Sequence, residues 1–187
     1  MTDRLWYVSY GSNLLRERFF TYLTGSDDSS EFGAHPTAPS TALPAEEKWL
    51  WIDHVLYFAG VSRRWTGSSA FVATTEDATN RSVAHGYLVD RRQFAHLAAV
   101  ENVVATIDVV ATETLAIGQW SQLAVDREGE NFRGKYDALL RLPDIDGQPA
   151  FTLTSSIVRE PGEPSSRYFS TIRRGLLSAS IDLDVDA

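Results

Sequence analysis

The chain has 187 residues, a formal net charge of −8, 43% hydrophobic residues and no cysteine. This length suits one domain with a sizeable core, and the acidic balance argues against nucleic-acid binding through bulk electrostatics. The lack of cysteine excludes disulfides, thiolate catalysis and cysteine-ligated zinc sites. The first residues form no signal-peptide core, and no apolar run approaches the ~20 residues that span a bilayer, so we expect a cytoplasmic protein that binds no membrane.

The N-terminal segment predicts a strand followed at once by a helix. Residues 4–10 form an apolar and aromatic run typical of a buried strand. Gly11 permits a sharp turn, Ser12 and Asn13 are favoured helix N-caps, and apolar residues recur at helical spacing over about 13–24. Such a junction turns backbone N–H groups outward at a helix N-terminus, where a carboxylate can bind. Most junctions of this kind are plain connectors, so both interpretations stay open here.

The next segment, residues 25–48, predicts a long loop. It is rich in Ser, Pro, Thr, Ala and Asp and shows no periodicity, and loops of this length are typically functional lids or disordered. The chain re-enters the fold at 49–52, and short apolar runs predict strands at 54–59, 69–74 and 83–89. We therefore expect residues 25–48 to form a rim or lid over a site.

The middle of the chain predicts one clear helix. Asp90 is placed to cap a helix over 91–100. Residues 103–123 have mixed helix and strand character, and residues 127–131 read as a charged turn.

The C-terminal third predicts a hairpin and a last helix. Strands at 136–142 and 150–154 flank Asp146-Gly147, a dipeptide typical of tight hairpin turns. Ser165-Ser166 then precedes a helix predicted at about 167–179.

These elements predict an α+β fold, because short strands separated by turns alternate with inserted helices. We expect a small mixed or antiparallel β-barrel, or a curled sheet, with flanking helices. Residues 1–187 are predicted to form a single domain with an acidic tail at 181–187 and no internal repeat.

Glu101 is the first candidate for catalysis. It follows an amphipathic helix, with Ala-Ala-Val before it and Asn-Val-Val after it. If these neighbours are buried, the carboxylate is partly desolvated, which raises a carboxylate pKa. A raised pKa suits a general base or acid that works near neutrality. The alternative is a solvated glutamate at the end of a helix.

Other catalytic patterns are missing from the sequence. Gly11-Ser12 lacks the second glycine of a nucleophile elbow, and there is no Walker or dinucleotide fingerprint. The pairs Arg63-Arg64 and Arg173-Arg174 are interpreted as solvated surface pairs. HExxH-type metal spacing is not found among the histidines, which are His35, His54, His85 and His96.

The string Tyr10-Gly11-Ser12-Asn13-Leu14, placed after an apolar strand, resembles the signature of the gamma-glutamylcyclotransferase family. The spacing Leu97-x-x-x-Glu101 is similar to the string that carries the family's catalytic glutamate, with Ala98 at its Asp position and Asn102 at its Gly position. His85–Val89 resembles the strand that precedes this string in the family. Three further segments resemble the family in the same order along the chain: Trp65–Ala70, Gly134-Lys135-Tyr136 and Pro164–Tyr168. An insertion before Tyr136 and the long loop at 25–48 depart from the simplest members.

The resemblance implies an enzyme that releases 5-oxoproline from a gamma-glutamyl amino acid, peptide or amine, with no metal or organic cofactor. It implies that Glu101 is the general base and that the turn from Tyr10 to Leu14 binds the glutamyl carboxylate. Tyr136 and Tyr168 would offer hydroxyls to this small-molecule substrate, as would Tyr10. A non-catalytic binding or regulatory protein on the same fold is the alternative, and another acyl or amide chemistry in the same pocket is a third option.

Overall fold

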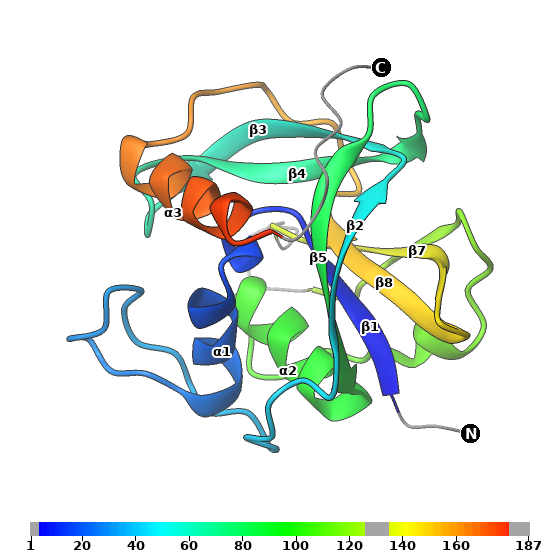
Figure 1. Ribbon diagram of the computed structural model, residues 1–187, viewed down its shortest axis with the longest axis horizontal. Helices are drawn as coiled ribbons and strands as arrows, with labels where there is room; N and C mark the ends of the chain where they lie inside the picture. The colour runs from blue at the N-terminus through cyan, green and yellow to red at the C-terminus, as the bar shows by residue number, and fades with distance from the viewer. Residues whose placement is uncertain (1–3, 126–134, 180–187) are drawn as a thin grey trace.

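The computed structural model describes residues 4–125 and 135–179. Within them, strands form a mixed sheet in the order β2-β5-β1-β8-β7-β6 and a separate antiparallel pair, β3-β4 (Figure 1). In chain order the strands are β1 (Arg4–Ser9), β2 (Glu47–Ile52), β3 (His54–Ser62), β4 (Gly67–Glu76), β5 (Ser82–Asp90), β6 (Trp120–Gln122), β7 (Ala138–Ile145) and β8 (Gln148–Thr154). The helices are η1 (Ser12–Leu14), α1 (Arg16–Thr24), α2 (Arg91–Glu101), η2 (Val110–Glu113) and α3 (Ser166–Leu177).

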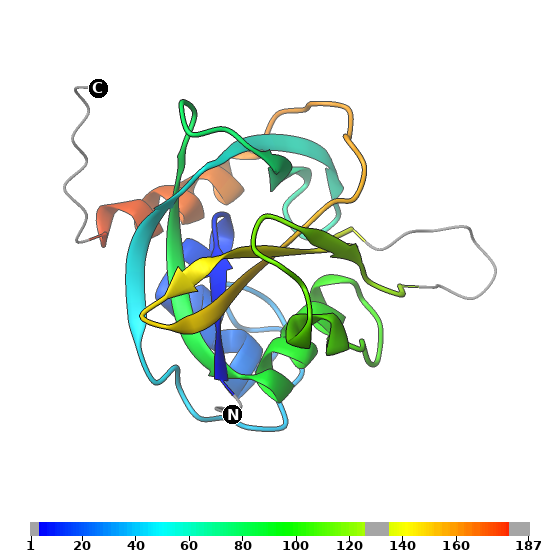
Figure 2. The same ribbon diagram turned by 90° about the vertical axis from the view of Figure 1, so that its right-hand side faces the viewer.

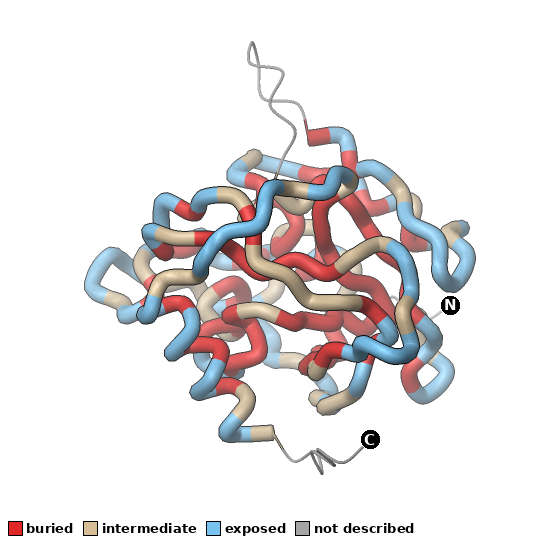
Figure 3. Tube along the Cα trace, turned by 90° about the horizontal axis from the view of Figure 1, so that it is seen from above, coloured by how far each residue is buried: buried red, intermediate tan, exposed pale blue. Residues whose placement is uncertain are grey.

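Strand β1 lies at the centre of the larger sheet and separates two hydrophobic cores. It pairs antiparallel with β5 and parallel with β8. Because side chains alternate across a strand, Leu5 and Tyr7 pack with the core that includes α1 and α2, whereas Trp6 and Val8 pack with the core that includes α3. Figure 3 shows buried residues running through the central strands and exposed residues gathering in the loops.

The two sheets are connected by a continuous arc and by a side-chain bridge. In Figure 2 β2 and β3 follow one curve from the larger sheet to the smaller. Thr154 of β8 donates to the carbonyl of Val72 at 2.6 Å and accepts from its N–H at 3.2 Å. The predicted α+β class, with a curled mixed sheet and flanking helices, is confirmed.

The predicted helix start after Gly11 is wrong by several residues. A three-residue 3-10 turn, η1, comes first, and Leu15 then adopts an extended conformation before α1 begins at Arg16. Neither helix has a side-chain N-cap. The Asn13 side chain does not cap a helix because it bonds to other side chains instead.

The remaining predictions differ from the structure mainly at boundaries. Strand β2 begins at Glu47, inside the segment predicted as loop, while the mixed segment 103–123 contains η2 and β6. Asp90 caps α2 in a reciprocal capping box with Gln93. The charged turn at 127–131 and the acidic tail at 181–187 lie outside the described residues. No helix in the described part of the chain is long and apolar enough to cross a membrane.

Candidate functional site

A cavity of about 570 Å³ opens where β1 ends. Its walls come from η1, α1, the ends of α2 and β3, the start of β4, and α3. Seven predicted site residues line it: Tyr10, Gly11, Ser12, Asn13, Glu101, Tyr136 and Tyr168. The eighth, Leu14, does not, because its side chain is buried in the core beside α3. The fold thus gathers residues from both ends of the chain around one space.

Glu101, the last residue of α2, lies half-buried in the cavity wall. Its Oε1 accepts hydrogen bonds from Asn13 Nδ2 at 3.3 Å and from the Tyr22 hydroxyl at 2.5 Å. Asn13 is 4% exposed, and its Oδ1 has no hydrogen-bond partner among the described residues. A buried unpaired acceptor is costly, so this oxygen indicates a place for a ligand donor next to the carboxylate.

Asn102 fixes the end of α2 against the segment that carries Tyr136. Its Nδ2 donates to the carbonyls of Ala98 and Tyr136, both at 2.9 Å, and its Oδ1 accepts from the Tyr136 N–H at 2.9 Å. The backbone of Asn102 has φ −98°, which any residue can adopt. The Asn102 side chain therefore holds the end of α2, and with it Glu101, against the segment that carries Tyr136.

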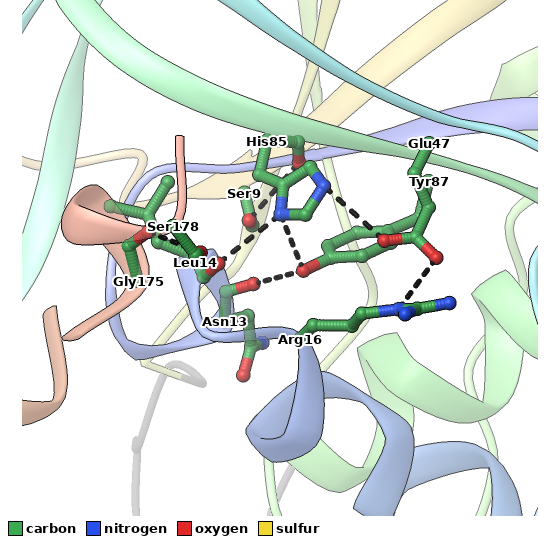
Figure 4. Close-up of polar contacts among 9 residues, drawn as sticks. All are labelled: Ser9, Asn13, Leu14, Arg16, Glu47, His85, Tyr87, Gly175 and Ser178. Carbon is green, nitrogen blue, oxygen red and sulfur yellow. Dashed lines mark hydrogen bonds and ion pairs between the residues drawn. The ribbon is translucent and has the colours of Figure 1, made fainter. Parts of the chain in front are cut away.

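A buried network of polar side chains holds the turn at η1 (Figure 4). The Tyr87 hydroxyl donates to the Asn13 carbonyl at 2.8 Å, and His85 Nδ1 lies 3.1 Å from the Leu14 carbonyl. Burial lowers the pKa of His85 to about 4, so the ring is neutral and donates from Nδ1. Glu47 lies 3.5 Å from His85 Nε2. Two backbone carbonyls of the turn are thereby satisfied away from the cavity.

Helix α3 packs directly on the same turn. A Cβ added at Gly175 would lie 2.7 Å from the Leu14 carbonyl carbon and from the Leu15 nitrogen. Such contacts are far inside van der Waals distance, so only glycine lets the helix approach this closely. This close packing brings Tyr168, seven residues earlier on α3, to the cavity.

The three predicted tyrosines differ in what their hydroxyls can offer. Tyr10 donates to the Leu153 carbonyl at 2.5 Å, and Tyr136 donates to the Ala70 carbonyl at 3.2 Å. Tyr168 accepts from the Ala70 N–H at 3.2 Å, and no described residue accepts its own proton. Burial raises the pKa of Tyr168 to about 12. Tyr168 is therefore a protonated donor with its hydrogen available at the cavity.

Several cationic side chains at this site are not among the residues predicted from the sequence. The cavity-lining cations are Arg18, Arg63, Arg64 and Lys135, and Glu101 is the one acidic side chain that lines it within the described residues. Burial lowers the pKa of Lys135 to about 8, and its Nζ donates to Ser69 Oγ. A cationic cavity in a chain of net charge −8 favours an anionic ligand.

The sequence contains a pattern from which Tyr22 and Arg18 could have been predicted as site residues. They stand four residues apart on α1, so their side chains share one helix face. Arg18 precedes Phe19 on a face that is otherwise apolar. Because charged residues are rarely buried without a partner, a charge on such a face indicates a binding or structural role. Arg64 and His35 come from irregular segments, where no periodic pattern predicts the direction of a side chain.

The solved proteins that are similar in structure to this chain include the following two. The first is an uncharacterized protein from Homo sapiens, with a TM-score of 0.57 and 16% sequence identity over 98% of this chain and 84% of that one. The second is a gamma-glutamyl cyclotransferase, with a TM-score of 0.52 and 17% identity over 97% of this chain and 83% of that one. No protein-family model and no curated protein sequence matches. The chain therefore has the fold of gamma-glutamyl cyclotransferase.

Proposed function

We propose that this protein is a cyclotransferase that releases 5-oxoproline from a gamma-glutamyl amino acid, peptide or amine. The observation that carries the proposal is the contact between Glu101 and Asn13 at the wall of a cationic cavity. It places a carboxylate beside an unpaired amide oxygen and beside donors suited to an anionic substrate. The fold shared with a gamma-glutamyl cyclotransferase supports the same reaction class.

The reaction is intramolecular. The α-amine of the substrate attacks its own γ-carbonyl carbon, a new C–N bond closes the five-membered ring, and the bond to the leaving nitrogen breaks. Holding the glutamyl chain folded back on itself replaces a bimolecular encounter, and orientation of this kind supplies a large part of a rate acceleration. The cavity contributes by fixing both ends of the glutamyl group.

Glu101 moves the protons in this scheme. Its carboxylate takes a proton from the attacking amine and returns a proton to the leaving nitrogen. Oε1 is occupied by Asn13 and Tyr22, whereas Oε2 has no hydrogen-bond partner among the described residues. We assign the proton transfers to Oε2. We assign Asn13 Oδ1 as the acceptor for a hydrogen of the attacking α-amine, so that the lone pair of this amine points toward the γ-carbonyl carbon.

The carbonyl oxygen and the α-carboxylate need donors. The Tyr168 hydroxyl carries an available proton. The backbone N–H of Asn13 has no acceptor among the described residues. We assign these two donors to the glutamyl oxygens, with Gly11 leaving room for the Tyr168 hydroxyl. Because α1 begins only at Arg16, this part of the site relies on individual N–H groups and not on a helix N-terminus.

Glu101→Gln tests the proposal. Glutamine keeps the size of the side chain and an oxygen that accepts from Tyr22, but it cannot take a proton. General acid–base catalysis contributes roughly 10²–10⁴-fold, so 5-oxoproline release should fall by at least that order. Glu113→Gln removes a carboxylate at an exposed position outside the cavity and should leave turnover unchanged.

Two outcomes would contradict the proposal. Turnover of Glu101→Gln within a few-fold of the unmodified protein would remove Glu101 from the role of base. If the unmodified protein binds gamma-glutamyl compounds but releases no 5-oxoproline from any of them, the fold serves a binding or regulatory role instead.

A further inference from the structure

The loop between α1 and β2 sends one buried histidine, His35, into the cavity wall. Its Nδ1 lies 3.1 Å from the Gly33 carbonyl. Its Nε2 lies 2.9 Å from Arg18 Nη1 and 3.0 Å from Arg64 Nη1. Guanidinium groups only donate, so Nε2 carries the lone pair and Nδ1 carries the proton. Burial and the two arginines lower the pKa of His35 to about 3, so the ring stays neutral.

Two cations therefore meet at one neutral ring without a counterion. Arg18 is 2% exposed, and its partners are the uncharged side chains of Thr21, Tyr22 and His35. Arg64 donates to His35 and to the carbonyls of Phe32 and Ala34. No carboxylate of the described residues lies within ion-pair distance of either guanidinium. A buried cation such as Arg18 is normally paired, and the more exposed Arg64 guanidinium repels it.

One buried donor is also unused. Arg18 Nε has no hydrogen-bond partner among the described residues, although the side chain lines the cavity. An unpaired buried donor on a charged group costs more than a neutral one. A bound anion would accept from this N–H and neutralise the pair of guanidinium groups at the same time. The neutral histidine holds the two groups at a common point, where both reach one ligand.

We infer that Arg18 and Arg64, aligned by His35, bind an anionic group on the leaving amine of the substrate. The inference rests on the proposed function, which assigns the α-carboxylate to the turn at Asn13. The Tyr22 hydroxyl lies between the Arg18 guanidinium and the Glu101 carboxylate, since it accepts from Arg18 at 2.8 Å and donates to Glu101 at 2.5 Å. A second anion on the leaving group is the part of a gamma-glutamyl compound that this position suits.

The positive charge of the arginine pair favours some leaving groups over others. An amino acid or peptide attached through its nitrogen keeps a carboxylate, which two guanidinium groups bind well. A neutral amine offers nothing to the pair, and a leaving group with an extra cation is repelled. His35 and Arg64, both from connecting segments, would thus set substrate choice without touching the reacting atoms.

Two matched substrates test the inference. Gamma-glutamyl-alanine and gamma-glutamyl-alaninamide differ only in the carboxylate of the leaving group. A hydrogen-bonded charge contributes roughly 10–100-fold in an equilibrium or rate ratio, so kcat/KM should favour the acid by that factor. Arg64→Gln should lower kcat/KM for the acid by a similar factor and leave the amide unchanged. Arg173→Gln removes the same charge from an exposed position outside the cavity and should change little.

The outcomes separate the inference from the proposed function. Equal kcat/KM for the two substrates in the unmodified protein, or an equal loss on both in a folded Arg64→Gln variant, would overturn the subsite. If neither substrate yields 5-oxoproline, the proposed function fails, and calorimetric binding still decides the subsite. The acid should then bind at least about tenfold more tightly than the amide, and equal affinities would reject the arginine pair as an anion site.

Discussion

The Tyr22 hydroxyl donates a 2.5 Å hydrogen bond to the Glu101 carboxylate, and this contact joins α1 to the end of α2. Arg18 donates to the same hydroxyl at 2.8 Å. Burial raises the pKa of Tyr22 well above its ordinary value, against the opposing effect of Arg18. The hydroxyl therefore stays protonated and remains a donor to the carboxylate over the whole working pH range. It holds one oxygen of Glu101 in place and leaves the other for chemistry.

Tyr22→Phe should slow the reaction without removing the base. The variant keeps the ring and deletes the donor, and a hydrogen bond to a charged group contributes about 1.5–3 kcal/mol. We expect kcat to fall roughly 10–100-fold if the whole contribution is expressed in the transition state. The ionised carboxylate also loses a stabilising donor, so the acidic limb of the kcat/KM profile should move to higher pH.

The pH profile separates this positioning role from a loss of packing. Tyr57→Phe, which deletes a hydroxyl from a partly buried ring on β3 outside the cavity, serves as the control. A Tyr22→Phe protein with lower kcat and an unmoved acidic limb would mean that the hydroxyl acts only through structure.

Gly11→Ala should disturb the site through Tyr168. A Cβ at position 11 would lie 2.9 Å from the Tyr168 hydroxyl oxygen and 3.3 Å from Ala70 Cβ. The tyrosine is buried and bound to the Ala70 N–H, so it must shift. Overpacking costs about 1–3 kcal/mol, and we expect weaker binding of 5-oxoproline together with a modest fall in Tm.

A double variant identifies the clash. In a Tyr168→Phe background the hydroxyl is gone, so Gly11→Ala should cost less in both Tm and affinity than it does in the unmodified protein. An equal cost in the two backgrounds would show that Gly11 is needed for something other than space beside Tyr168.

The strand, the turn and the helix that ends at Glu101 could be predicted because each has a local pattern. The apolar run of β1, the capping pair Asp90 and Gln93, and the apolar face before Glu101 are readable without tertiary structure. The start of α1 could not be placed, because Ser12 and Asn13 have the composition of N-caps. Both residues line the cavity, and the Asn13 side chain bonds to Tyr7 and Glu101, so tertiary contacts override that local preference.

The contact between Arg64 and His35 could not be predicted from the sequence. The sequence favours a solvated Arg63-Arg64 pair, and Arg64 is indeed exposed, yet its side chain also bonds to His35. That contact depends on an ordered fold of the loop, in which Ser26 pairs with His35 across an isolated bridge. A loop without periodicity gives no register, so its contacts cannot be derived from spacing. Arg18, in contrast, could have been noticed as a charge on a buried helix face.

His85 predicts how stability depends on pH. Burial lowers its pKa to about 4 in the folded protein, while the unfolded chain has the ordinary value near ~6.5. Below that value the unfolded state binds the proton more readily, so unfolding becomes easier as the pH falls. The contribution of His85 is complete above pH ~6.5 and is lost progressively down to about pH 4. His35, with its pKa lowered to about 3, acts in the same direction.

His85→Gln should therefore flatten the decline of Tm between pH 6.5 and 4. Glutamine can still donate an N–H to the Leu14 carbonyl, but it takes up no proton when the chain unfolds. One proton accounts for at most about 1.4 kcal/mol per pH unit, and each kcal/mol corresponds to roughly 2–4 °C in Tm for a chain of this size. His96→Gln, at a more exposed histidine that bonds to the Pro36 carbonyl, is the matched control and should keep the original slope. Circular dichroism melts of the three proteins from pH 4 to 8 give the comparison. A slope in His85→Gln as steep as that of the unmodified protein would mean that His85 gains no extra proton on unfolding.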